Sequence, residues 1–200
     1  MRFSLKKVVI IGGTGRMGQW FAKQFRRLGL EVYIAGRSLE KTSLTAKKLK
    51  VKAANSESLK KANLVLLSTP INETPKLIME TASQMAENSI LTEIASVKME
   101  AVKALEEAAE KFGVKTVSLH PLFGPGAPSL KGQKIVVIPV KKNLEAAKFL
   151  SDFLIGCFAV FLIFSLIFSP IYGVFLATTG KTLEGITIII NSSVIWVFFY

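Results

Sequence analysis

Short apolar runs alternate with segments of helical spacing along most of the chain. The first run, residues 8–11, contains only valine and isoleucine, which is typical of a strand buried on both faces of a parallel sheet. Apolar residues then recur at helical spacing up to Leu28, and Gly29 is expected to end this helix. A second β-branched run follows at 32–35. The pattern predicts a strand, a helix and a second strand at the start of the chain.

The same alternation continues through the first three quarters of the sequence. Strands are expected at 64–68, 90–93, 114–118 and 134–138, and helices at 72–85 and 99–112. Because strands that are joined by helical crossovers run parallel, this order predicts an α/β fold with a parallel sheet. We expect one domain over residues 1–152.

A glycine-rich turn links the first expected strand to the first expected helix, with the spacing Gly13-x-Gly15-x-x-Gly18. The spacing alone is weak evidence, but its position between strand and helix is that of a Rossmann-like dinucleotide-binding domain. There the glycines allow a tight turn, a close approach to a pyrophosphate, and packing of the helix on the strand. The alternative is a turn without a ligand. The expected cofactor contacts are Gly13, Thr14, Gly15, Arg16, Met17 and Gly18.

The end of the second strand indicates which nicotinamide cofactor is bound. Sites that prefer NAD place an aspartate or glutamate there, against the ribose 2′-hydroxyl. This chain has Gly36, Arg37 and Ser38 instead, and a guanidinium suits a 2′-phosphate. We therefore expect NADP, with contacts from Arg37 and Ser38. The alternative is that Arg37 is only a surface cation and that NAD is also accepted.

Three polar segments directly follow expected strands, namely 68–70, 95–98 and 119–121. The carboxyl ends of parallel strands meet at one edge of the sheet, where ligands bind in such folds. Ser68, Thr69 and Pro70 are expected beside the cofactor. His120 is the only histidine, and an imidazole with an ordinary pKa of roughly 6.5 can act as a general base near neutral pH. Taken alone, a single loop histidine is more often structural.

Composition narrows the classes of partner. The formal net charge is +12, but most of the cations are lysines scattered over expected helices, so we expect a solvated surface and no nucleic-acid partner. Cys157 is the only cysteine, which excludes an intramolecular disulfide and fits a reducing compartment. The apolar run near the amino terminus is too short for a signal peptide. We expect a cytoplasmic protein without a metal site.

The last quarter of the chain breaks this pattern. Only Lys181 and Glu184 are charged within residues 153–200, and residues 153–180 carry no charge. Since roughly 20 apolar residues can span a bilayer, one interpretation is a membrane anchor at 153–180. A second is a set of buried helices in a soluble dimer, and a third is a disrupted reading frame near codon 154. We treat residues 153–200 as a separate, atypical apolar segment.

The first 152 residues carry several motifs that together resemble prephenate dehydrogenases. In order, they are Gly-Gly-Thr-Gly-Arg-Met-Gly at 12–18, Ser68-Thr69-Pro70-Ile71, Ala95-Ser96-Val97-Lys98, His120-Pro121-Leu122-Phe123-Gly124-Pro125 and Ser129-Leu130-Lys131-Gly132-Gln133. The resemblance covers about residues 6–152. The early motifs are shared with many dehydrogenases, whereas the last two are fairly specific. Glu93 stands where the family often has aspartate.

The resemblance implies a reaction and roles for three residues. The family oxidatively decarboxylates prephenate to 4-hydroxyphenylpyruvate in tyrosine biosynthesis, with transfer of a hydride to the nicotinamide. By resemblance, His120 accepts a hydrogen bond from the substrate hydroxyl and Ser96 helps to position it. Lys98 either attracts the dicarboxylate substrate or merely starts the next helix. Arogenate is an alternative substrate.

The family continues with a helical domain that pairs two subunits and supplies a cationic group for a substrate carboxylate. Residues 153–200 do not match it, so we expect this chain to bind NADPH with weak or absent turnover, and the family's homodimer is doubtful. Two other functions stay open. One is a dehydrogenase of the same fold for another small hydroxyacid, and the other is a non-catalytic NADP-binding module.

Overall fold

The computed structural model describes residues 4–141, 143–156, 160–163, 186–191 and 194–199. The strands are β1 (Lys7–Ile11), β2 (Glu31–Ala35), β3 (Lys52–Ala53), β4 (Leu64–Leu67), β5 (Ile90–Glu93), β6 (Lys115–Pro121), β7 (Lys134–Pro139), β8 (Val160–Ile163), β9 (Ile186–Asn191) and β10 (Val194–Phe199). The helices are α1 (Arg16–Arg27), α2 (Leu39–Leu49), α3 (Ser56–Lys60), α4 (Thr74–Ala82), α5 (Met99–Phe112) and α6 (Leu144–Gly156).

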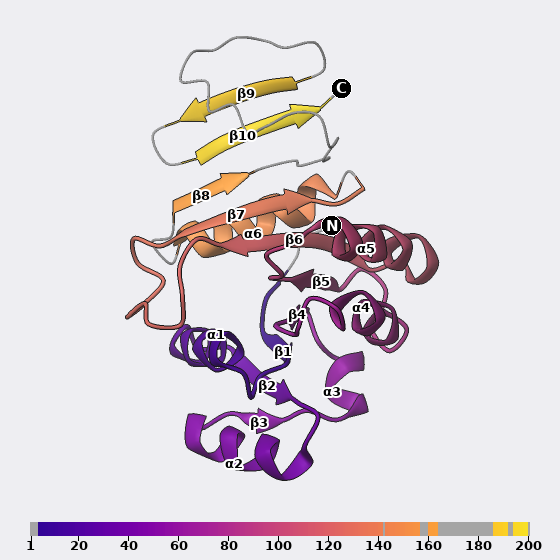
Figure 1. Ribbon diagram of the computed structural model, residues 1–200, viewed down its shortest axis with the longest axis vertical. Helices are drawn as coiled ribbons and strands as arrows, with labels where there is room; N and C mark the ends of the chain where they lie inside the picture. Colours follow the sequence, from indigo (N-terminus) through magenta and orange to yellow (C-terminus); the bar gives the residue numbers. More distant parts are fainter. Residues whose placement is uncertain (1–3, 142, 157–159, 164–185, 192–193, 200) are drawn as a thin grey trace.

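The described strands form one sheet in the order β3-β2-β1-β4-β5-β6-β7-β8-β10-β9 (Figure 1). The pairs from β3 to β6 are all parallel, as the alternation of strands and helices predicts. β7 is antiparallel to β6 because the segment 122–133 joins them without a crossover helix. The expected Rossmann-like α/β fold is confirmed, with this antiparallel strand as an exception to the parallel sheet.

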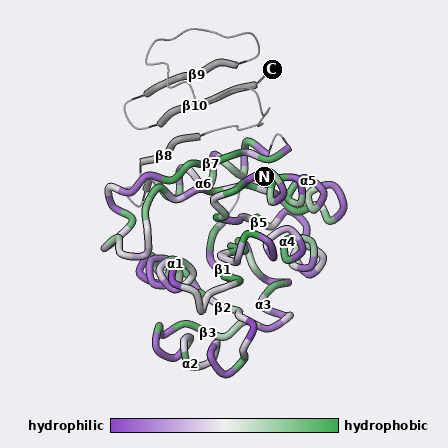
Figure 2. The backbone as a smooth tube through the Cα atoms, viewed as in Figure 1, coloured by the Kyte–Doolittle hydropathy of each residue, from purple (hydrophilic) through white to green (hydrophobic). Residues whose placement is uncertain are grey.

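The β-branched residues of β1 divide between the two faces of the sheet. Val8 and Ile10 pack with the apolar sides of α1 and α6, whereas Val9 packs with α4 and α5. All three are fully buried. This double burial explains why β1 lacks the polar alternation of a one-sided strand. Hydrophobic colour gathers on β6 and β7, and the helix α1 is largely hydrophilic on its outside (Figure 2).

Beyond residue 143, the described elements are the helix α6 and the strands β8, β9 and β10. The helix α6 continues past the expected boundary at 152, and the described elements that follow it are strands. The candidate span at 153–180 lies largely outside the described residues. Among the helices that the structure does describe, none is both long and apolar enough to cross a membrane. The described residues therefore give no support to a helical interpretation of the part beyond α6.

Candidate cofactor and substrate site

The glycine-rich turn is shaped by close packing with three neighbouring elements. The amides of Gly12 and Gly13 both donate to the carbonyl oxygen of Ala35, at 2.9 Å each, which ties the turn to the end of β2. Gly12 has a positive φ of 78°, and a Cβ atom there would overlap the carbonyl oxygen of Ser68. The Gly-x-Gly-x-x-Gly spacing does not include Gly12. Its position directly after a buried strand is the signal that could have indicated it.

The amino end of α1 is open for an anion. Gly15 is the N-cap and brings no capping side chain, and the first turn of the helix contains no acidic residue. The free amide groups and the positive end of the helix dipole therefore remain available to a phosphate. The side chain of Gln19 donates to the carbonyl oxygen of Thr14 at 2.8 Å and steadies the turn.

Replacing Gly18 by alanine tests this packing. A Cβ atom there would overlap the Gly12 carbonyl oxygen and lie 2.8 Å from the Cα of Gly13. We expect G18A to lower the free energy of unfolding by about 1–3 kcal/mol and to abolish NADPH binding, because helix and turn must separate. Gly124→Ala is the control, since nothing lies within 4 Å of a Cβ at that position. Urea unfolding and NADPH fluorescence give the two readouts; tight NADPH binding by G18A would contradict the packing argument.

The residues after β2 lie beside the glycine turn, but their side chains differ in how readily they could contact a ligand. A Cβ on Gly36 would lie 3.0 Å from the Thr14 hydroxyl, so the two segments are adjacent. The Arg37 side chain is 85% exposed and forms an ion pair with Glu73 at 3.3 Å. The Ser38 hydroxyl is the N-cap of α2 and accepts from the amide of Lys41 at 3.2 Å. The exposed Arg37 can thus reach a ligand by leaving Glu73, whereas the Ser38 hydroxyl already caps a helix.

The three polar segments that follow the strands converge on one pocket of about 450 Å³. Its lining residues are Met17, Ser68, Thr69, Pro70, Ile71, Ile94, Ala95, Ser96, His120, Pro121 and Phe123. Six of the expected site residues are therefore together here, while Lys98 is not among them. Ile94 and Phe123 were not expected. Phe123 follows His120 closely in sequence, which is the signal that could have indicated it.

His120 lies on β6 opposite Val136 of β7. Its Nδ1 atom is buried and has no hydrogen-bond partner among the described residues. Burial lowers the pKa of His120 from its ordinary value, and the charge of Lys98 lowers it further. A backbone hydrogen bond at Ala95 and the charge of Glu93 oppose this shift. The imidazole is therefore neutral near pH 7 and available as a hydrogen-bond acceptor.

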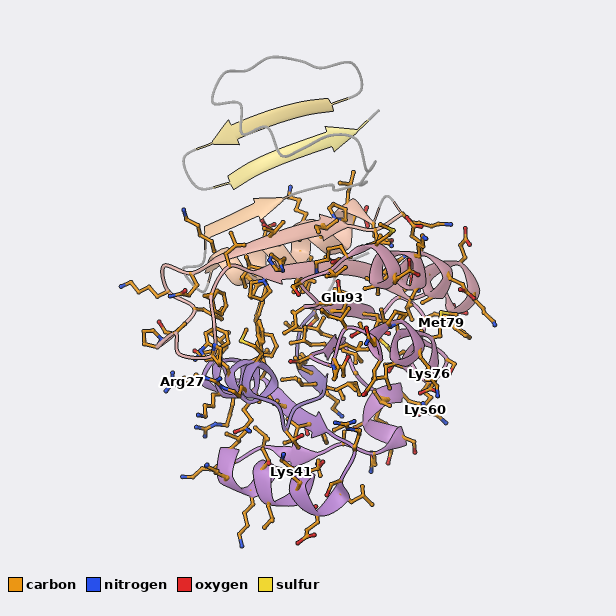
Figure 3. All side chains as sticks on the ribbon, in the orientation of Figure 1. Arg27, Lys41, Lys60, Lys76, Met79 and Glu93 are labelled. Carbon is orange, nitrogen blue, oxygen red and sulfur yellow. The ribbon has the colours of Figure 1, made fainter. Side chains whose placement is uncertain are left out.

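Lys98 is buried in an ion pair and does not line the pocket. Its Nζ donates to Glu93 Oε1 at 2.9 Å and to the carbonyl oxygen of Leu119 at 2.7 Å. Glu93 is fully buried, and it lies inside the fold whereas the labelled cations lie at the periphery (Figure 3). The backbone of Lys98 is the N-cap of α5, as one of the two interpretations of this residue expects. Burial lowers the pKa of Lys98, and Glu93 opposes that shift.

The segment 122–133 is fastened to the cofactor helix. The indole Nε1 of Trp20 donates to the carbonyl oxygen of Ala127 at 2.6 Å, and the ring centroids of Trp20 and Phe123 are 4.7 Å apart. Arg27 Nη1 also donates to the carbonyl oxygen of Pro128, at 3.4 Å. These contacts hold Phe123 at the wall of the pocket, across from the strand ends.

The sequence and fold match known proteins. Residues 21–163 match the family described as prephenate dehydrogenase, nucleotide-binding domain, a range that includes Ser96 and His120 but begins after the glycine turn. The chain belongs to the prephenate dehydrogenase family. A probable arogenate/prephenate dehydrogenase of Methanocaldococcus jannaschii is 38% identical over 138 residues, covering 68% of this chain and 31% of that protein. The T-protein of Haemophilus influenzae is 32% identical over 133 residues, covering 66% and 31%.

Solved structures share the fold of this prephenate dehydrogenase family member. The prephenate dehydrogenase of A. aeolicus, in complex with hydroxyphenyl propionate and NAD⁺, has a TM-score of 0.66 at 24% identity, covering 82% of this chain and 62% of that one. The Synechocystis arogenate dehydrogenase has a TM-score of 0.67 at 20% identity, covering 80% and 59%. The chain spans about a third of the length of the curated relatives that it matches.

Proposed function

We propose that this chain binds a nicotinamide cofactor, with NADP preferred, and carries the cofactor half of a site for the oxidative decarboxylation of prephenate or arogenate. The observation that carries the proposal is the shared pocket. Ser96 and the neutral His120 meet Ser68, Thr69 and Met17 there, beyond the carboxyl ends of β4, β5 and β6. This is where a substrate hydroxyl would lie between an acceptor and the end of the cofactor.

The side chains define what the protein itself contributes to such a reaction. His120 lines the pocket and offers a nitrogen of its neutral imidazole to the substrate hydroxyl, whose proton it accepts. Ser96 lies in the same pocket and orients that hydroxyl. Phe123, Ile94 and Ile71 contribute apolar side chains to the pocket wall, against which a substrate ring can pack. The bound nicotinamide supplies the hydride acceptor, and loss of carbon dioxide makes the ring aromatic.

Product analysis tests the reaction. Purified protein is incubated with NADP⁺ and either prephenate or arogenate, and reduced cofactor and carbon dioxide are measured together. Turnover should be weak, and any reduced cofactor should be matched by an equal amount of carbon dioxide. Cofactor reduction with another small hydroxyacid, but not with prephenate or arogenate, would instead indicate a dehydrogenase of the same fold for that acid. Saturable NADPH binding without any product would indicate a non-catalytic module, and no saturable binding would reject the cofactor site.

The preference for NADP rests on Arg37, which is exposed but paired with Glu73. Replacing Glu73 by glutamine should raise the affinity for NADP⁺ by about two- to fivefold, since exposed ion pairs of this kind are worth roughly 0.2–1 kcal/mol. The affinity for NAD⁺ should not change, because NAD⁺ lacks the 2′-phosphate. The control is Glu80→Gln, which removes an exposed partner of Lys76 on the same helix. Equal changes for both cofactors would contradict contact between Arg37 and the 2′-phosphate.

A further inference from the structure

We propose that the buried Glu93–Lys98 ion pair is a positioning device, which ties the loop carrying Ser96 to the strand carrying His120 and so fixes the two side chains relative to each other. This inference rests on the proposed function, in which both residues bind the substrate hydroxyl. Neither Glu93 nor Lys98 lines the pocket, so each acts through the residues that it holds.

The Glu93 carboxylate gathers groups from two strands. Glu93 is the last residue of β5 and pairs in register with Ser118 of β6. In parallel strands the side chains of such partners lie on one face, and the Ser118 hydroxyl donates to Glu93 Oε1. The other oxygen, Oε2, accepts from the amide of Ala95 at 2.5 Å. One buried carboxylate therefore holds both β6 and the first turn of the loop after β5.

Lys98 closes the same loop from its far end. Its ammonium returns to Glu93 Oε1, so the segment between them is held at both ends while Ser96 faces the pocket. The ammonium also donates to the carbonyl oxygen of Leu119, the residue before His120. A single side chain thus contacts the Ser96 loop and the backbone that sets the direction of His120. The loop that carries Ser96 therefore cannot move without the strand that carries His120.

Stability alone does not account for this arrangement. Buried ion pairs can often be replaced by apolar residues of similar size without loss of stability, since two charges must be removed from water. The pair has a second effect, because its charges act on the imidazole. Glu93 and Lys98 are the charged groups that shift the pKa of His120, and its partner across the sheet on β7 is the apolar Val136. Lys98 lowers that pKa more than Glu93 raises it, which keeps the acceptor neutral.

The test uses the fact that His120 is the only histidine. Its pKa is measured by NMR titration of the imidazole carbons in protein without a histidine tag. The double variant Glu93→Gln/Lys98→Met removes both charges and preserves side-chain size. We expect an upward shift of the His120 pKa toward its ordinary value, because the stronger, positive influence is lost. We also expect the Ala95 amide to exchange with solvent roughly tenfold faster, because its charged acceptor is gone.

The matched control is Glu100→Gln/Lys103→Met, which makes the same change in an exposed ion pair of α5. It should leave the His120 pKa and the Ala95 exchange rate unchanged. The single variant Lys98→Arg retains the charge and should keep the pKa close to that of the wild type. A folded double variant with an unchanged pKa and unchanged exchange would overturn the proposal. So would an upward shift of equal size in Lys98→Arg.

These readouts require neither cofactor nor substrate, so they separate the inference from the proposed function. NADPH affinity should be unchanged in the double variant, because the ion pair does not contact the glycine turn. Where turnover is measurable, kcat should fall about 10²-fold without a change in KM for the cofactor, as expected when reacting groups are misplaced. A pKa shift in a protein without turnover supports the positioning device, whereas a failure to bind NADPH would reject the proposed function and leave the device in place.

Discussion

Replacing Lys98 by methionine should lower the free energy of unfolding by about 3–5 kcal/mol, the usual cost of leaving one buried charge without its partner. Glu93 has no exposed surface, so water cannot replace the ammonium. The carbonyl oxygen of Leu119 loses its donor as well. The carboxylate must then either remain buried and charged without a counter-ion or take up a proton, and both cost free energy. Urea unfolding, followed by circular dichroism, measures the loss as a lower midpoint at constant m.

The double variant Glu93→Gln/Lys98→Met distinguishes this cause from a loss of packing. It leaves no charge behind, so it should recover most of the stability that the single variant loses. Lys103→Met breaks an exposed ion pair and should change stability by less than about 0.5 kcal/mol. If the double variant were as unstable as the single one, the loss of stability would come from the packing of the Lys98 side chain and not from the unpaired carboxylate.

Replacing His120 by glutamine should lower kcat by about 10²–10⁴-fold, which is the usual contribution of a general acid or base. Glutamine preserves polarity and approximate size, but it cannot take up a proton near neutral pH. NADPH affinity should be unchanged, because the glycine turn and Arg37 remain in place. Stopped-flow measurement of cofactor reduction, together with a fluorescence titration of NADPH, separates the two effects.

The pH profile adds a second criterion. Only the neutral imidazole accepts a proton, so activity should fall as the pH drops through the pKa of His120. That pKa lies below the ordinary value because of burial and the Lys98 charge, so the acidic limb should lie at lower pH than for an unperturbed histidine. The limb should be absent in H120Q, whose residual activity has no such group. Persistence of the same limb would assign it to another residue.

Much of the fold follows from short-range patterns in the sequence. The run Val8–Ile11, the glycine turn and the apolar face of α1 each have a local signature, and their order leaves few alternatives for the topology. The meeting of Ser68, Ser96 and His120 could also be predicted, because the carboxyl ends of parallel strands share one edge. Local pattern thus predicts which segments reach the pocket.

The direction of individual side chains could not be predicted in the same way. Lys98 lies in the segment 95–98, which lines the pocket with other residues. Its ammonium nevertheless points inward to the Glu93 carboxylate, which the strand register places beside Ser118. That register depends on strand pairing between distant segments. The contact between Trp20 and Ala127 likewise joins parts of the chain that are far apart and has no sequence signature. Sequence reasoning therefore left two interpretations of Lys98 open, substrate attraction and the start of the next helix, and could not predict its contact with Glu93.

The Trp20 contact also joins two walls of the pocket, because it connects the helix α1 to the segment that carries Phe123. The indole fastens the segment 122–133 to the helix whose amino end faces the cofactor. A cofactor that displaced α1 would therefore also displace the wall beside His120, without touching that wall. Linkage is reciprocal. If the cofactor changes the affinity for a second ligand at this wall by some factor, that ligand changes the affinity for the cofactor by the same factor. With such linkage, a substitution at Trp20 would change the cooperativity between the two ligands, away from the reacting atoms.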